Sequence, residues 1–391
     1  MQSAMSKLLG IGAILLLVLG FWGGARVAGG EDKPVLNQPK VDSRTIPVDG
    51  FRRVKPGTPL VFPQDHGAHP EYQTEWWYFT GNLWSEDGRE FGYQLTFFRR
   101  ALSPQLINTN RGSEWLTNQV YMAHFAVADV KNSYFKATER LERGAVGLAG
   151  AETNPFFSVW LRNWRVDQVD EKTFQLSAHE GSIGLRLNLS DQKGIVLQGV
   201  NGYSQKGSEE GNASMYYSFT RLSSVGEIHS GETVYRVSGY SWMDHEFSTS
   251  ALARDQVGWD WFALQFDDGS ELMIYTIRNE KGEIDPFSKG VFIDKDQSIT
   301  HLESTQFQIQ VKSRWRSEKS GGVYPAEWLI LIPDLNLELT VKPKIPNQEL
   351  LVSVIYWEGA VSVSGVRSTR PILGWGYAEL TGYVTSMQGR F

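Results

Sequence analysis

Short runs in which apolar or aromatic side chains alternate with polar ones dominate the sequence, and turn residues separate these runs about every ten residues. A clear example is TEWWYFTGNLW (74–84), which is followed by the turn SEDGRE and by the returning run EFGYQLTFFRRAL. Alternation with a period of two is typical of strands that bury one face. The pattern therefore predicts an all-β fold, built as a sandwich or a barrel.

The hairpin pattern occurs twice. The segment 259–278, WDWFALQFDDGSELMIYTIR, reads like the segment that begins at Trp76: an aromatic strand, an acidic turn with glycine and an alternating return strand. Two similar hairpins predict two related β-domains. Aromatic residues make up 13% of the chain and fall on both alternating positions of several runs, which predicts antiparallel barrels with a cavity inside. Only residues 137–150 resemble a helix, and two interior glycines weaken that pattern.

The first 63 residues differ from the rest. Residues 1–29 have the pattern of a signal peptide or an N-terminal anchor, in which Lys7 precedes an uncharged run of fifteen residues and then small residues. As a helix this run spans about 22 Å, less than the roughly 30 Å hydrocarbon core. We expect cleavage near residues 27–29 and export to the periplasm, or a tether to the inner membrane if the segment is retained. Membrane contact is expected only through this segment.

The remaining chain is divided by composition. Residues 30–63 are polar and rich in proline, which predicts an extended tether or wrapping segment. The expected N-terminal barrel domain covers residues 64–240, and the expected C-terminal barrel domain covers residues 241–391.

Charge and composition exclude several functions. The net charge of −6, with both signs interspersed, gives no basic surface for nucleic acid. The absence of cysteine excludes disulfides, thiolate nucleophiles, cysteine-ligated zinc and a lipid-modified cysteine. Phosphate-binding and dinucleotide-binding motifs are missing, and Ser241 in GYSWM lacks the glycine of a nucleophile elbow. We expect no cofactor.

The run YSWMDHEF (240–247) places three consecutive ionisable residues in an apolar, strand-like region. Neighbouring side chains of a strand point to opposite faces. Trp242, Asp244 and Glu246 therefore share one face, whereas His245 points to the other. The three ionisable groups cannot form a single cluster while the strand stays regular.

Acids with indole neighbours are candidate proton donors. Asp260 lies between Trp259 and Trp261, Glu75 precedes a pair of tryptophans, and Asp244 follows one. Burial next to aromatic rings disfavours the charged carboxylate and raises its pKa. A carboxyl group with a raised pKa can donate a proton near neutral pH. Alternatively, these carboxylates accept hydrogen bonds and close the ends of the barrels.

The histidines give a weaker signal. The segment DHGAHPEY supplies His66, His69 and Glu71, and residues 244–246 supply Asp-His-Glu, but neither set has the spacing of a helical zinc motif. We therefore predict no metal site. His124 alternates with apolar neighbours in YMAHFAVADV, so it is either a hydrogen-bonded core residue or a polar residue that lines the cavity.

Several blocks together resemble the carotenoid 1,2-hydratase superfamily, and in particular its AttH-type branch of secreted proteins, sometimes labelled secreted hydrolases. The resemblance covers about residues 50–391 and rests on HPEYQTEWWYFTGNL, YMAHFAVAD, GYSWMDHEFSTSAL, GWDWFALQFDDGSELMIYTIR, NQELLVSVIYWEGAVSVSG and GWGYAELTGY. It implies two lipocalin-like barrels, the second beginning near the WMDHE run. It also implies cofactor-independent addition of water to an isoprenoid double bond, through a carboxylic acid that protonates the alkene.

Carried onto this chain, the resemblance assigns the acid to Asp244, with Trp242 two residues before it and Asp260 and Trp261 in the following strand. A cation in an apolar cavity needs such a donor and aromatic faces nearby. Tyr217 in MYYSF is a further wall residue. The hydratases carry a tyrosine two residues before the acid and an asparagine soon after it, whereas this chain has Trp242 and Asp-His-Glu.

Three functions fit these observations. The first is an exported double lipocalin-like protein that binds an apolar, lipid-like or isoprenoid-like ligand, with an envelope transporter as a candidate partner. The second is an acid-catalysed hydratase or isomerase, a hydro-lyase rather than a hydrolase, with Asp244 and Asp260 as catalytic residues. The third is an envelope scaffold. The candidate ligand-binding residues are Trp242, Glu246, Trp259, Trp261, Glu75, Trp77, His124 and Tyr217.

Overall fold

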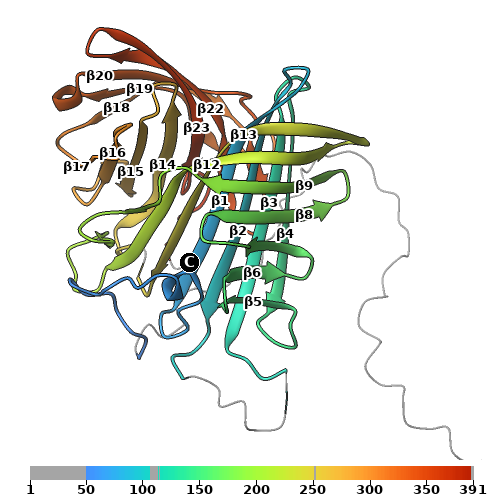
Figure 1. Ribbon diagram of the computed structural model, residues 1–391. Coiled ribbons are helices and arrows are strands. Elements are labelled where there is room, and N and C mark those ends of the chain that lie inside the picture. Colours follow the sequence, from blue (N-terminus) through green and yellow to red (C-terminus); the bar gives the residue numbers. More distant parts are fainter. Residues whose placement is uncertain (1–49, 106–112, 114, 251, 389–391) are drawn as a thin grey trace, which may run out of the picture. The chain divides into compact units, whose positions relative to one another are not determined.

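Antiparallel strands form nearly all of the regular structure in the computed structural model, and they belong to two sheets (Figure 1). The model describes residues 50–105, 113, 115–250 and 252–388. The expected signal or anchor segment, and the extended segment up to residue 49, lie outside the described residues. Among the residues described, no helix has the length and apolarity needed to cross a membrane.

The first sheet contains thirteen strands and forms a nearly closed barrel. Its main path runs β4-β3-β2-β1-β13-β12-β9-β8-β7-β6-β5, and two short strands pair with β12. The strands are β1 (Thr74–Ser85), β2 (Glu90–Ala101), β3 (Gln119–Asp129), β4 (Tyr134–Arg143), β5 (Ala149–Thr153), β6 (Phe157–Leu161), β7 (Trp164–Gln168), β8 (Thr173–Glu180), β9 (Ile183–Asp191), β10 (Ile195–Leu197), β11 (Tyr203–Gln205), β12 (Ala213–Ser230) and β13 (Thr233–Ser248).

The second sheet contains ten strands and forms a half-barrel. Its path runs β17-β16-β15-β14-β23-β22-β20-β19-β18, with β21 paired to β22. The strands are β14 (Gln256–Phe266), β15 (Glu271–Asn279), β16 (Lys289–Ile293), β17 (Ile299–Glu303), β18 (Gln308–Arg316), β19 (Val323–Ile332), β20 (Leu337–Pro343), β21 (Glu349–Leu351), β22 (Ile355–Arg367) and β23 (Arg370–Leu380). The prediction of an all-β, lipocalin-like fold is confirmed.

The two repeated hairpins form as the sequence predicts. In β1–β2, the amide of Ser85 bonds the carbonyl of Arg89 at 2.9 Å, and Gly88 has a φ of +77°. In β14–β15, the amide of Phe266 bonds the carbonyl of Ser270 at 2.9 Å, and Gly269 has a φ of +84°. Glycine adopts this left-handed conformation without the steric cost that a Cβ imposes, which explains the acidic-glycine turn in both copies.

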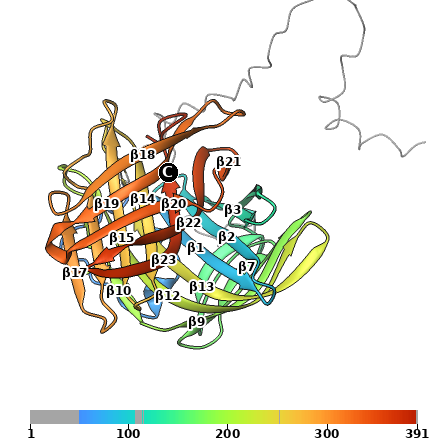
Figure 2. The ribbon, with the colours of Figure 1, turned by 90° about the horizontal axis from the view of Figure 1, so that it is seen from above.

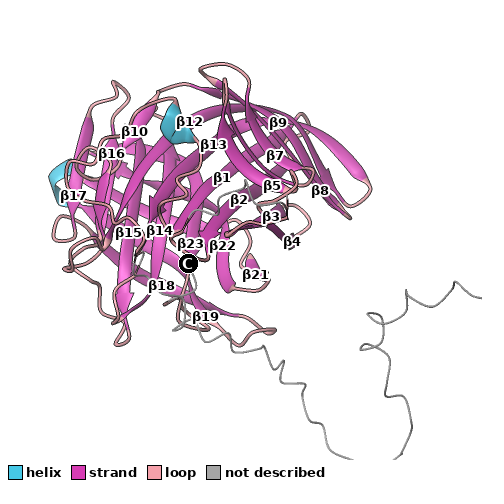
Figure 3. Cartoon of the chain, turned by 90° about the horizontal axis from the view of Figure 1, so that it is seen from below, coloured by secondary structure: helices cyan, strands magenta, loops and turns pink. Residues whose placement is uncertain are grey.

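Helical structure is limited to two short 3-10 turns, η2 (Gln64–His66) and η3 (Pro333–Leu335), in the described part of the chain (Figure 3). The weak helix signal over residues 137–150 was wrong, because that segment supplies most of β4 and the start of β5. Ala137 pairs with Ala126 on β3, and Val146 and Gly147 have positive φ values that end the run. Strand pairing outweighs the local propensity there.

The boundary between the sheets lies later than the sequence pattern indicates. We expected residue 241 to begin the C-terminal domain, but β13 pairs with β1 and β12 and lies wholly in the first sheet. The second sheet begins at β14, so residues 241–248 belong to the first barrel. The long β12–β13 hairpin keeps this strand in register with its predecessor.

Side chains fill the interiors of both sheets. The core of the first barrel includes the buried Trp77, Phe79 and Leu95, and the core of the second includes Phe262, Leu264 and Trp328. We expected a cavity inside a barrel, but the pocket lies outside the two cores and takes side chains from both sheets. A third apolar cluster, which includes Tyr78, Trp242 and Trp261, lies between the two sheets.

The two sheets pack through their outer faces, with β1 against β23 and β2 against β22 (Figure 2). Polar bonds accompany this contact: Asn82 Nδ2 donates to the carbonyl of Gly376 at 3.0 Å, and Gln265 Nε2 donates to the carbonyl of Thr220 at 2.7 Å. Aromatic residues on both alternating positions of β1 and β14 thus serve two apolar surfaces, the barrel core and the interface.

Candidate functional site

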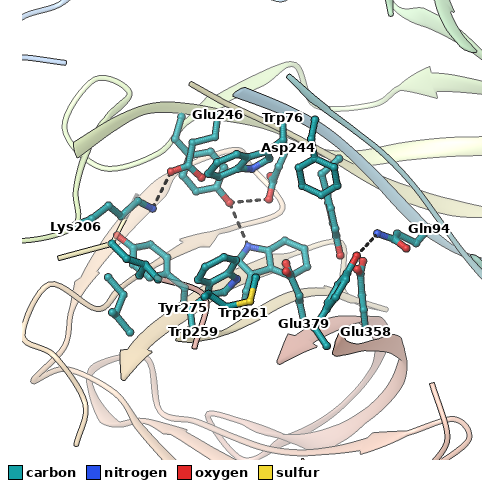
Figure 4. Close-up of a pocket in the computed structure, with 17 residues that line it drawn as sticks. Trp76, Gln94, Lys206, Asp244, Glu246, Trp259, Trp261, Tyr275, Glu358 and Glu379 are labelled. Atoms are coloured by element: carbon teal, nitrogen blue, oxygen red, sulfur yellow. Dashed lines mark hydrogen bonds and ion pairs between the residues drawn. The ribbon is translucent and has the colours of Figure 1, made fainter. Parts of the chain in front are cut away.

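A pocket lies between the two sheets and takes side chains from both (Figure 4). The space between its walls, including the part open to solvent, is about 870 Å³. The lining residues are mostly aromatic or acidic: Trp76, Tyr78, Gln94, Phe98, Lys206, Tyr216, Asp244, Glu246, Leu252, Trp259, Trp261, Tyr275, Ile277, Tyr356, Glu358, Glu379 and Met387.

Side chains alternate between the two faces of β13, and two acids of this strand line the pocket. Asp244 and Glu246 line it, and Trp242 lies in the apolar cluster beside it. Met243 belongs to the barrel core, and His245 is buried on that same side, stacked at 4.9 Å on Trp77. The separation of the Asp-His-Glu run into two faces is as the sequence predicts.

Asp244 is almost completely buried and accepts three hydrogen bonds. Tyr216 Oη and Trp242 Nε1 each donate to it at 2.7 Å, and the Ser218 hydroxyl donates to Oδ1. Trp261 Nε1 donates in turn to Tyr216 Oη at 3.2 Å. Burial raises the pKa of Asp244 to about 7, although the three donors oppose that rise. Both protonation states are therefore accessible near neutral pH.

Glu246 has a different environment two residues along the same face. Lys206 Nζ lies 3.1 Å from its Oε1, and the Ser214 hydroxyl donates to the same oxygen. The ammonium group also lies 4.1 Å from the centre of the Tyr275 ring. Burial alone would lower the pKa of Lys206, but Glu246 and Tyr275 raise it, so the lysine keeps its charge beside Glu246.

Two further acids face the pocket from the second sheet. Glu358 on β22 and Glu379 on β23 are direct cross-strand partners, and Glu379 is also the partner of Trp261 on β14. Burial raises the pKa of Glu379 to about 8 and raises the pKa of Glu358 well above its ordinary value. Among the residues described, neither oxygen of Glu358 makes a hydrogen bond of good geometry, although the hydroxyls of Tyr78 and Tyr356 lie close enough to lower its pKa in part. Like charges directly opposite one another destabilise a sheet, which also favours the neutral acids.

Some of the remaining expected site residues line the pocket, one lies behind it, and others lie in the core of the first barrel. Trp259 and Trp261 line the pocket. His124 stands behind it and bonds the hydroxyl of the lining residue Tyr356 at 2.7 Å. Trp77 and Tyr217, which we expected to contact a ligand, point into the first barrel instead. The lining residue on β12 is Tyr216, the neighbour of Tyr217 on the opposite face.

Asp260 does not belong to the pocket, although we expected it to be catalytic. It is on the face of β14 opposite Trp259 and Trp261 and is held by Arg278 Nε at 3.0 Å and by Tyr383 Oη at 2.9 Å. Burial raises its pKa and Arg278 opposes the rise. Its indole neighbours in the sequence could not enclose it, because adjacent strand residues face opposite sides.

Glu75, which we expected to contact a ligand, is fully buried near the start of β1 and does not line the pocket. It accepts bonds from His69 Nδ1 at 2.7 Å, His245 Nε2 at 2.9 Å and Arg99 Nε at 2.7 Å. His245 Nδ1 lies 3.0 Å from Tyr217 Oη, and that oxygen lies 2.6 Å from a nitrogen of His66. The expected ligand residues Glu75 and Tyr217 thus belong to one internal hydrogen-bond network.

The same network contains the only group of potential metal ligands found among the described residues, His69, Glu75 and His245. Arg99 and His69 already neutralise Glu75, and with burial opposing them they hold its pKa well below the ordinary value. The nearby glutamate raises the pKa of His69 to about 9, against the effect of its burial, so His69 carries a proton where a metal would need a lone pair. These residues fit an internal ion network better than a metal centre.

Sequence reasoning missed several lining residues. Glu358 in IYWEGAV and Glu379 in GYAELTG are single acids in apolar strands, the same signal that singled out Asp244. Tyr216 differs from the expected Tyr217 only in the face of its strand. Lys206 lies in a polar connection after β11 and carries no signal of its own.

The chain resembles known proteins in both sequence and fold. The sequence profile of the AttH-like family matches residues 53–383. The crystal structure of a protein assigned as AttH from Nitrosomonas europaea is 31% identical, with a TM-score of 0.76, and the match covers 85% of this chain and 100% of that one. Kievitone hydratase from Nectria haematococca is 11% identical with a TM-score of 0.64, over 86% of this chain and 97% of its own, and shares the fold. No curated protein matches the chain.

Proposed function

The chain belongs to the AttH-like family, and from this premise and the geometry of the pocket we propose that it is a cofactor-independent enzyme that protonates a carbon–carbon double bond of an apolar substrate. The observation that carries the proposal is the buried carboxyl of Asp244, whose pKa is raised to about 7 beside an aromatic cavity. An acid is most effective when its pKa lies near the working pH.

The proposed reaction begins with transfer of the Asp244 proton to one alkene carbon. The π electron pair forms the new C–H bond, and the neighbouring carbon becomes a cation. Water then adds to this carbon and returns a proton to the Asp244 carboxylate, so that alkene and water give an alcohol. Loss of a proton from an adjacent carbon to the same carboxylate instead gives an isomerised alkene. Either route restores the acid without a cofactor.

The surroundings of Asp244 suit both halves of this cycle. Burial favours the neutral acid before proton transfer, and the donors Tyr216, Trp242 and Ser218 stabilise the carboxylate after it. The faces of Trp259 and Trp261 line the same pocket, and indole rings attract positive charge within about 6 Å.

Binding of an apolar ligand without turnover is the second candidate. It is favoured by the three hydrogen bonds that Asp244 accepts from the protein, which give the carboxyl a structural role. A carrier would use the same aromatic walls and would leave its ligand unchanged.

Deuterium incorporation separates the two candidates. The full chain is incubated in D2O with a panel of isoprenoid alkenes, and carbon-bound deuterium is measured by mass spectrometry. We expect incorporation by the wild type and by Asp87→Asn, an exposed turn variant, and none by Asp244→Asn. Incorporation that persists in Asp244→Asn would refute the assignment of the acid. Alkenes that bind and are recovered without deuterium would support the carrier.

A further inference from the structure

The pocket contains more acidic than basic groups. Four of its lining residues are acids, and Lys206 is the only basic side chain among the lining residues described. Lys206 is paired with Glu246, so it does not compensate the other acids. Asp244 has its three neutral donors. Within the part of the chain that the structure describes, the cross-strand pair Glu358 and Glu379 therefore has no cationic partner.

Glu358 is the unusual member of this pair. Its side chain is only 1% exposed and lines the pocket, yet neither of its oxygens makes a hydrogen bond of good geometry among the described residues. Its neighbours are neutral: the hydroxyls of Tyr78 and Tyr356 lie close enough to lower its pKa, against the larger effect of burial. Buried polar atoms are nearly always satisfied, so a carboxyl that faces a cavity without a well-formed hydrogen bond or a charged neighbour indicates a group that a ligand completes. Glu358 and Glu379 lie next to each other at the end of the pocket away from Lys206 (Figure 4).

We propose that Glu358 and Glu379 form a counter-ion site for a positively charged ligand group, so that the pocket binds cationic amphiphiles, an alkylammonium attached to an apolar body. The inference rests on the proposed function in one respect, because the same site would stabilise the carbocation formed there. It also stands without turnover, since a stable ammonium ion needs only the charge and the aromatic walls.

Aromatic rings complete the site. Tyr78 and Tyr356 face Glu358, and Trp259 faces Glu379. Rings of this kind attract an ammonium through their faces, and the apolar side chains of the pocket cover the alkyl part of the ligand. A neutral alcohol of the same length gains the apolar contacts but not the ionic one.

Binding of a cation should release protons. Burial keeps the pair largely protonated at neutral pH, and an ammonium ion binds the ionised form, so affinity rises as pH increases through the pKa of Glu379, about 8. An aliphatic amine stays charged over this range because its pKa is about 10. The other titratable groups that face the pair or share its pocket are Tyr78, Tyr216, Tyr275, Tyr356, Tyr377, Asp244, Glu246 and Lys206.

The test compares n-octylamine with n-octanol as probes of the full chain by titration calorimetry from pH 6 to 9. We expect the amine to bind at least tenfold more tightly than the alcohol at pH 8 and to release about one proton, measured in two buffers of different ionisation enthalpy. Glu358→Gln and Glu379→Gln should lose this preference, and Glu338→Gln, an exposed charge-matched control on β20, should retain it.

Equal binding of the two probes, or an amine preference that survives in Glu358→Gln, would overturn the proposal. So would loss of the preference in Asp244→Asn alone, which would assign the counter-ion to that residue. If a glutamine variant does not fold, the wild-type proton count still decides, because amine binding without proton release contradicts the site. None of these outcomes depends on the deuterium assay, so the two proposals fail separately.

Discussion

Asp244→Asn should stabilise the protein at alkaline pH and change its stability little at acidic pH. The folded-state pKa of Asp244 is about 7 and its ordinary value is 3.8. The folded protein therefore binds this proton more tightly than the unfolded chain does. Stability from this group is fully present below about pH 4 and is lost as pH rises through 7. Asparagine resembles the neutral acid in shape and does not titrate.

The magnitude follows from the pKa shift. One pKa unit corresponds to about 1.4 kcal/mol, so a shift of roughly three units corresponds to about 4 kcal/mol above pH 8. Lost hydrogen bonds to the carboxylate offset part of this gain, by about 1 kcal/mol. Unfolding of a unit of this size has an entropy of about 0.7 kcal/mol/K, so a net 3 kcal/mol raises Tm by about 4 °C.

Thermal unfolding of the wild type and Asp244→Asn, followed by circular dichroism from pH 4.5 to 9, measures this effect. The Tm difference should grow with pH, most steeply around pH 7. Glu358 and Glu379 titrate with the same sign and are present in both proteins, so most of their contribution cancels in the difference. The charge of Asp244 also raises the pKa of Glu379, so removing that charge adds to the stabilisation of the variant at alkaline pH. A difference that is independent of pH, or a variant less stable at pH 9, would show that Asp244 is ionised throughout and would refute the reasoning.

Other predictions follow from neighbouring contacts. Tyr216→Phe removes a donor to the Asp244 carboxylate and should raise the pKa of Asp244 further. The alkaline limb of the pH–rate profile should therefore move to higher pH. Tyr217→Phe, the matched change on the opposite face, should lower stability by about 1–3 kcal/mol in urea unfolding and leave that limb in place. Arg99→Met leaves the fully buried Glu75 without its guanidinium partner, and urea unfolding should show a loss of about 3–5 kcal/mol. A loss below 1 kcal/mol would contradict this role of the ion pair.

Much of the fold was predictable from local patterns. Period-two alternation and the two acidic-glycine turns identified strands and hairpins, because pleated strands and left-handed turn residues impose those patterns directly. Local patterns failed over residues 137–150, where pairing with β3 decided the conformation. They also placed the domain boundary too early, because nothing in the run around residue 241 records its pairing with β1.

The candidate site was predictable only in part. Alternation placed Asp244 and Glu246 on one face with Trp242, and the same rule, applied to Asp260, separates it from the two tryptophans beside it. Glu358 lies more than one hundred residues from Asp244 in sequence, and no local pattern relates the two. Their common pocket exists only because the outer faces of two sheets pack together.

By itself, the sequence determined which side chains share a strand face, since alternation is a property of the extended backbone. Only the tertiary structure decided which of those faces meet. It also decided whether the groups beside each buried carboxyl are basic side chains or neutral hydrogen-bond donors. That last distinction sets the charge of every buried acid, because a low-dielectric interior makes ionisation depend on the few groups within reach.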